Sequence, residues 1–213
     1  MNLLEKYQAY REIGMKLNHK ILDSCVNTEI LMKSAKLLGI PRKNDIMLYE
    51  TEDEMGVLME FTMHEQMKNN KNAIEIYRDK YREQNRIEKT ILDAMLLSYT
   101  SLFRVISSLE SENIVLLYDV LNKKDNIKLI DINLSKTVTP GLLFFTRIVP
   151  FKDFNMTSGF SFVFQSYMEE YLRRRYKKIG KKVESDRDSI KRFVSFFRLN
   201  KEDGMEVDYE DVS

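Results

Sequence analysis

The side chains best suited to bind a ligand by charge lie between residues 173 and 192. This stretch holds ten basic and three acidic residues, a local balance of +7. Such a density can neutralise several phosphates of a nucleic-acid backbone and release their counterions. The neighbouring Tyr167, Tyr171 and Tyr176 could stack on exposed bases. The candidate nucleic-acid contacts are Arg173, Arg174, Arg175, Tyr176, Lys177, Lys178, Lys181 and Lys182.

Two other interpretations of this stretch stay open. It could dock on an acidic surface of another protein, or it could be a solvated helix that pairs with acidic segments of its own chain. Residues 201–213 supply such a segment, since six acidic residues and one lysine give them a balance of −5. Folded back on the basic stretch, this acidic tail would compete with nucleic acid. The alternative is a solvated, disordered end.

A second group of polar side chains, Arg104, Asp119 and Arg147, falls on predicted strands. These three could line a binding groove, and an enzyme with an unfamiliar site would carry it in this part of the chain. Asp119 could instead cap a turn, or it could pair with either arginine across strands.

The chain lacks the residue patterns of the common catalytic and metal sites. Cys25 is the only cysteine, so neither an intrachain disulfide nor a thiolate zinc cluster can form. A Cys–His nucleophile pair would have to combine Cys25 with His19 or His64, the only histidines. There is no glycine-rich phosphate loop, nucleophile elbow or His-Glu-x-x-His helix. We therefore predict no catalytic residue, no metal and no cofactor, and a non-enzymatic protein is favoured without an enzyme being excluded.

Composition limits the class of protein further. Hydrophobic residues make up 43% of 213 residues, which is enough for a core, and 7 Gly and 3 Pro argue against a disordered chain. The net charge of +1 conceals the separation of a basic and an acidic segment. No apolar run approaches the roughly 18 residues of a membrane-spanning helix, and no signal pattern opens the chain. We expect a cytoplasmic protein without a membrane partner.

The first part of the chain has the apolar spacing of helices. Residues such as Tyr7, Tyr10, Leu17 and Ile21 recur at three- and four-residue steps. The helices predicted from this spacing, and from capping residues, cover about 2–24, 28–38, 52–67 and 73–97. We therefore expect residues 1–97 to form a helical region.

Near residue 98 the spacing changes to that of strands. Strands are predicted at about 102–106, 114–121, 127–132, 142–149 and 154–160. Four or five such short strands fit a small antiparallel β barrel or a curled sheet in residues 98–160. Helices return in residues 161–200, and the acidic tail occupies 201–213. The expected fold class is α+β, with helices on both sides of a small β module.

A series of short runs in the middle of the chain resembles a known group of proteins. The runs are residues 101–105, 117–121, 134–137, 140–144, 147–151 and 154–159. They resemble a group of uncharacterised bacterial proteins that combine N-terminal helices with a small β module. Part of the β pattern is similar to modules found beside SEC-C-type domains, although the SEC-C cysteines are absent and no zinc is implied. The resemblance implies this layout and no activity.

Together these patterns favour a non-enzymatic binding or adaptor protein that contacts nucleic acid through its basic C-terminal helix. The alternative is a protein–protein subunit of a larger bacterial assembly with a defence or regulatory role. An enzyme with an unrecognised site in the β module is the third interpretation. The sequence leaves the partner and the oligomeric state open.

Overall fold

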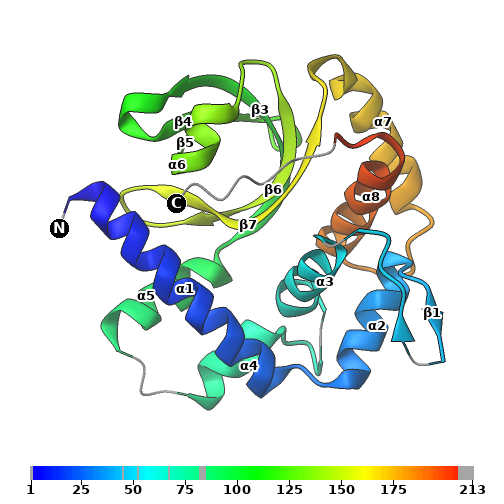
Figure 1. Ribbon diagram of the computed structural model, residues 1–213. Helices are drawn as coiled ribbons and strands as arrows, with labels where there is room; N and C mark the ends of the chain where they lie inside the picture. The colour runs from blue at the N-terminus through cyan, green and yellow to red at the C-terminus, as the bar shows by residue number, and fades with distance from the viewer. Residues whose placement is uncertain (1, 45, 52, 67, 82–84, 206–213) are drawn as a thin grey trace. The chain divides into compact units, whose positions relative to one another are not determined.

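The computed structural model describes residues 2–44, 46–51, 53–66, 68–81 and 85–205 (Figure 1). The chain divides into two compact units. The first consists of Met1–Leu97 with Glu184–Ile190, and the second of Ser98–Val183 with Lys191–Ser213. Among the described residues, no helix is both long enough and apolar enough to cross a membrane.

The first unit is helical, as the apolar spacing predicts, and it also contains a small hairpin. Its helices are α1 (Leu3–Cys25), α2 (Thr28–Leu38), α3 (Asp53–His64), α4 (Ala73–Lys80) and α5 (Arg86–Leu96), and its hairpin strands are β1 (Arg42–Lys43) and β2 (Ile46–Met47). Helix α1 contacts α3, α4 and α5, and α2 contacts α3. The segment 184–190 joins this unit through Arg187, whose Nη1 donates to the carbonyl oxygen of Glu65 at 3.2 Å.

Asparagine begins four of these helices. Asn2, Asn27, Asn72 and Asn85 each accept a hydrogen bond from a backbone N–H in the first turn of the helix that follows. This bond satisfies a donor that has no partner inside the helix. Helix α2 ends at Gly39, whose φ of 81° is a left-handed conformation that glycine adopts without strain.

The expected single helix over residues 73–97 is wrong, because two helices occupy this range. Helix α4 ends at its C-cap Tyr81, and α5 starts after Asn85, whose side chain accepts from the N–H groups of Ile87 and Glu88. Residues 82–84 lie outside the described part of the chain. Apolar residues stand at helical steps on both sides of the break, at Tyr77 and Tyr81 and again at Ile87 and Ile91, which is why the sequence suggests one long helix.

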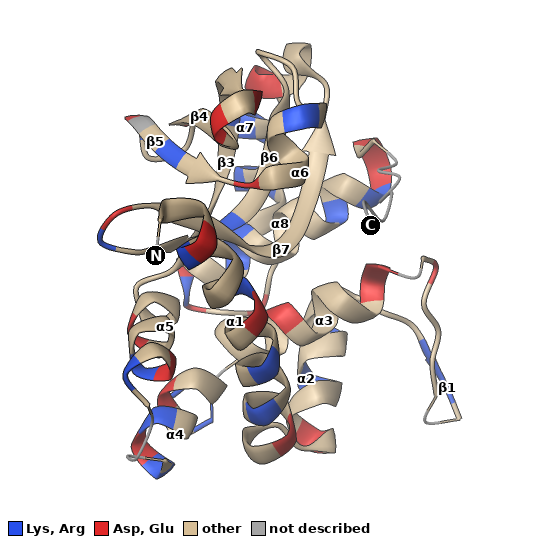
Figure 2. Cartoon of the chain, turned by 60° about the vertical axis from the view of Figure 1, so that its left-hand side comes forward, with Lys and Arg blue, Asp and Glu red and all other residues tan. Residues whose placement is uncertain are grey.

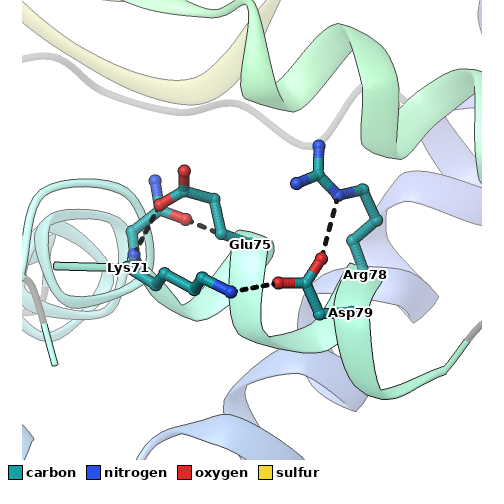
Figure 3. A network of polar contacts seen from close by, with 5 residues as sticks. Lys71, Glu75, Arg78 and Asp79 are labelled. Carbon is teal, nitrogen blue, oxygen red and sulfur yellow. Dashed lines mark hydrogen bonds and ion pairs between the residues drawn. The ribbon is translucent and has the colours of Figure 1, made fainter. Parts of the chain in front are cut away.

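A polar network runs along α4, from Lys71 before the helix to Asp79 near its C-terminal end (Figure 3). Glu75 accepts a hydrogen bond from the N–H of Asn72 and completes a capping box. Asp79 pairs with Lys71 at 2.6 Å and with Arg78 at 3.5 Å. These exposed pairs add little stability one by one, but the capping box determines where α4 begins.

The second unit contains the predicted strands and three helices. The strands are β3 (Tyr99–Leu109), β4 (Ile114–Asp119), β5 (Lys124–Ile130), β6 (Leu143–Pro150) and β7 (Asn155–Phe164), and the helices are α6 (Ile132–Thr137), α7 (Glu169–Gly180) and α8 (Asp188–Asp203). Sequence spacing missed α6. It starts where Asp131 accepts a hydrogen bond from the N–H of Leu134.

The expected antiparallel barrel is corrected to a curled mixed sheet. The neighbours follow the order β3-β4-β5-β7-β6, and β6 also pairs with β3. Four of these pairings are antiparallel, whereas β5 meets β7 in parallel at Leu129 and Asn155. When an odd number of strands closes on itself, their directions cannot alternate at every neighbouring pair. With five strands, at least one pair must therefore be parallel. The α+β class and the helices on both sides of the sheet are confirmed.

The curled sheet has an apolar side chain layer on each face. One face holds the core cluster of Phe103, Val105, Val115, Leu117, Ile127, Leu129, Val138, Phe144 and Ile148. On the other face, Phe145 stacks on Phe196 of α8 with ring centroids 4.3 Å apart, and Phe160 lies 5.1 Å from Phe193. Helix α8 therefore covers the β6–β7 part of the sheet with aromatic side chains.

Replacing Gly14 by Ala should stabilise the protein. Gly14 lies inside α1, and an added Cβ would sit 3.9 Å from Ile91 Cγ2, an ordinary van der Waals distance. Because alanine has the higher helix propensity, we expect the free energy of unfolding in urea to rise by about 0.5–1 kcal/mol. The matched control is Gly39→Ala, where the positive φ should lower the stability by about 1 kcal/mol. A loss of stability in Gly14→Ala would contradict this account of the α1–α5 packing.

Candidate functional site

Helix α7 presents one continuous exposed face. Exposed side chains recur every three to four residues from the short 3-10 turn at Ser166–Met168 to the residues just after the helix. They are Tyr167, Glu170, Tyr171, Arg174, Lys177, Lys178, Lys181 and Lys182. A spacing of three to four residues puts these side chains on one side of the helix.

The opposite face of α7 packs inside the second unit. Leu172 is fully buried, and the ring of Tyr176 stacks on Phe196 with centroids 5.4 Å apart. Gly180 lies beside α8, where a Cβ would come within 3.4 Å of Ser195 Oγ. Tyr176 was predicted to contact nucleic acid, but one side of its ring is covered by Phe196.

The three consecutive arginines of α7 are paired with carboxylates. Glu170 lies 2.7 Å from Arg174 and 3.5 Å from Arg173. Arg175 contacts Glu202 at 3.1 Å, and this hydrogen bond raises the pKa of the guanidinium. The pairs with Glu170 have the three- and four-residue spacing that a sequence reveals, whereas the pair with Glu202 joins two helices.

Four lysines make up the part of the basic stretch that stays unpaired. We call Lys177, Lys178, Lys181 and Lys182 the lysine cluster. All four side chains are exposed, and among the described residues none of them makes an ion pair or a side-chain hydrogen bond. Along α1 and α5, by contrast, charges of both signs are interspersed (Figure 2). The lysine cluster therefore combines like charges in the last turn of α7, at its C-cap Lys181 and just after it, where the macrodipole favours cations.

The beginning of the acidic tail contacts α7. Besides the pair of Glu202 with Arg175, the hydroxyl of Tyr171 donates to Asp203 at 3.0 Å, which raises the pKa of this tyrosine. The acidic residues thus engage an arginine and a tyrosine and leave the lysine cluster uncovered in the described range. Residues 206–213 lie outside the described part of the chain.

The second predicted group, Arg104, Asp119 and Arg147, is not brought together in one groove. Asp119 is opposite Phe103 in the register of β3 and β4, and Arg104 is the next residue after Phe103. Successive side chains of a strand point to opposite faces, so Asp119 and Arg104 lie on different faces. Arg147 is opposite Thr100, which places it on the face of Arg104.

Each member of this group has its own local partners. Asp119 is fully buried and accepts from Ser101 Oγ at 2.5 Å and from the N–H of Asn122 at 3.0 Å, so it caps the turn between β4 and β5. Arg104 pairs with Glu169 at 2.6 Å and lies over the ring of Tyr118. Of the roles considered for Asp119, the turn cap is the one that the structure contains.

Tyr99 lies near this buried carboxylate. Its pKa is raised to about 12, chiefly by burial and further by the charge of Asp119. The phenol therefore stays protonated at neutral pH, and it offers no base for acid–base chemistry.

Cys25 and the histidines do not form a nucleophile pair in the described structure. Burial raises the pKa of the Cys25 thiol, which lowers its thiolate fraction at neutral pH. His64 is buried on α3, with its Nε2 3.7 Å from Glu60 Oε2, and His19 is exposed on α1. The described residues also contain no group of three or more His, Cys, Asp or Glu placed to hold a metal ion.

A family of unknown function (DUF7986) matches residues 1–210. Neither the curated proteins nor the solved structures contain a match to the chain.

Removing the Asp119 carboxylate should destabilise the second unit. In Asp119→Ala, Ser101 Oγ and the N–H groups of Leu121 and Asn122 lose their acceptor. Buried donors without an acceptor should lower the free energy of unfolding by roughly 1–3 kcal/mol. Asp125→Ala, at an exposed position of β5, is the control and should change stability by at most about 0.5 kcal/mol. Equal stability of the two variants would show that Asp119 is not the turn cap.

Proposed function

The chain belongs to a family of unknown function, and we propose that this protein binds the phosphate backbone of nucleic acid through the lysine cluster. In this proposal the protein is a non-enzymatic binding or adaptor protein. A cytoplasmic location, as expected from the sequence, suits such a ligand.

The observation that carries the proposal is the contrast between the lysines and arginines of the basic stretch. Arg173, Arg174 and Arg175 already have carboxylate partners, at distances of 3.5, 2.7 and 3.1 Å. The lysine cluster is exposed and has no such partner among the described residues. Four neighbouring cations without counter-charges are suited to replace the counterions of a polyanion.

The same contrast supports binding that does not depend on base sequence. Recognition of guanine in the major groove typically uses an arginine fork that is free to make two hydrogen bonds. In α7 the forks of Arg174 and Arg175 are held by Glu170 and Glu202. Lysine ammonium groups act as point charges and contact phosphates without reading bases.

Neutralising two lysines of the cluster should weaken binding and reduce its dependence on salt. For Lys177→Gln/Lys181→Gln we expect the slope of log K against log salt for a single-stranded oligonucleotide to fall by about 1.4, because each phosphate contact contributes about 0.7. The measurement is fluorescence anisotropy at several salt concentrations.

The matched control removes the same charge elsewhere. Lys16 and Lys33 are exposed, and each pairs with a glutamate one helical turn away. Lys16→Gln/Lys33→Gln should therefore keep the slope of the unmodified protein. If both double variants keep that slope, the lysine cluster does not contact phosphates and the proposal is wrong.

A second candidate function, a subunit of a larger bacterial assembly, is favoured by one exposed apolar patch. We define the hairpin patch as Ile46, Leu48, Tyr49 and Met55, which follow one another at the second strand of the hairpin and the start of α3. Ile46 is 67% exposed and Met55 53% exposed. Four exposed apolar side chains within one short segment are more than the single scattered ones that a protein surface normally carries, so this segment is a candidate surface for protein contact.

The test of this second candidate is loss of a stoichiometric partner. We expect Ile46→Asp/Leu48→Asp to abolish co-purification of a partner with the tagged chain from its source cells, without a change in unfolding midpoint. Leu97→Asp, at a position 71% exposed outside the hairpin patch, is the control that should keep the partner. Retention of the partner in the hairpin variant would exclude the patch as its docking surface.

A further inference from the structure

The exposed face of α7 extends beyond the lysine cluster to an aromatic ring. Tyr167 lies in the 3-10 turn before the helix and is 83% exposed. A ring that is exposed to this extent does not contribute the hydrophobic stabilisation that its burial would give. An exposed ring on a charged surface therefore suggests a ligand contact. Between Tyr167 and the lysine cluster, the same face carries Glu170, Tyr171 and Arg174, and the carboxylate of Glu170 is paired with Arg174 at 2.7 Å.

Among the three tyrosines of this segment, Tyr167 is the one whose ring is unoccupied. Tyr176 stacks on Phe196, and Tyr171 binds Asp203 and lies under the guanidinium of Arg175. Within the described residues, Tyr167 makes no side-chain hydrogen bond, ion pair or ring contact. Both of its faces can therefore accept a base.

We propose that Tyr167 is a stacking platform for an unpaired base and that the ligand of this face is single-stranded nucleic acid. This inference rests on the proposed function, because the lysine cluster supplies the phosphate contacts. In a duplex the bases are already paired and stacked, so an exposed ring on a helix finds no free base face. In a single strand every base offers such a face, and stacking is tolerant of sequence.

The spacing along α7 fits a short single strand. Tyr167 and Lys177 are ten positions apart in the chain, along the 3-10 turn and α7, which corresponds to about 15 Å at the rise of an α-helix. A stacked strand covers this distance in about four nucleotides at 3.4 Å each. That length is at the lower end of the sites used by proteins that bind single strands through aromatic and basic side chains.

The test compares three single variants on a single-stranded oligonucleotide of about 16 nucleotides and on its duplex. For Tyr167→Ala we expect the dissociation constant for the single strand to rise roughly 5- to 150-fold, the range of one lost base stack. Duplex affinity should stay unchanged. Tyr167→Phe keeps the ring and should bind the single strand like the unmodified protein.

Leu97→Ala is the control for removal of an exposed apolar side chain, since Leu97 is 71% exposed in the first unit. It should leave both affinities unchanged, and all variants should share one unfolding midpoint. Unchanged single-strand binding by Tyr167→Ala, or an equal loss for single strand and duplex, would overturn the stacking role of Tyr167. Neither result would affect the salt slopes that test the lysine cluster, so failure of this inference is distinguishable from failure of the proposed function.

Discussion

The stacking of Phe196 between two rings determines which side of α7 reaches solvent. Phe196 lies 4.3 Å from Phe145 of the sheet and 5.4 Å from Tyr176 of α7, and its ring is nearly parallel to that of Phe145. Helix α8 is thereby attached to β6, and α7 is attached to α8. Once Tyr176 and Leu172 face inward, the 3.6-residue period places the lysine cluster outward. The candidate site therefore depends on an aromatic contact that itself carries no charge.

The two kinds of basic residue have different tasks in this unit. Arg104 pairs with Glu169, Arg175 pairs with Glu202, and Arg192 donates to the carbonyl oxygen of Thr100. The planar guanidinium suits such fixed contacts between elements. The lysines of α7 remain as flexible, hydrated cations. The +7 balance of the stretch therefore overstates the positive charge that a ligand can contact, because part of that charge stabilises the second unit.

Local sequence patterns predicted most of the helices and strands. These patterns fail where the structure depends on contacts between residues that are distant in the chain. Apolar spacing and asparagine caps indicate the helices of the first unit. The break between Tyr81 and Asn85 is missed because apolar residues at helical steps stand on both sides of it. The positions of the five strands are evident from the sequence. That β5 and β7 are parallel is not a local property, because it follows from the number of strands and the order in which they pair. In the site, Glu170 pairs with Arg173 and Arg174 at the three- and four-residue spacing of one helix, but it is not among the residues predicted from the sequence. The pair of Glu202 with Arg175 spans 27 positions, and no local pattern contains it.

The division of the chain has a consequence for folding during synthesis. Residues 184–190, including Arg187 with its bond to Glu65, complete the first unit, yet they follow the whole β sheet in the chain. Domains generally fold as units in the order of their synthesis. Here the N-terminal helices leave the ribosome first but obtain their last native contacts only after β3 to β7 have emerged. Maturation of the amino-terminal part thus waits for the carboxyl-terminal part, and a nascent chain that stops before residue 184 holds the sheet complete and the first unit unfinished.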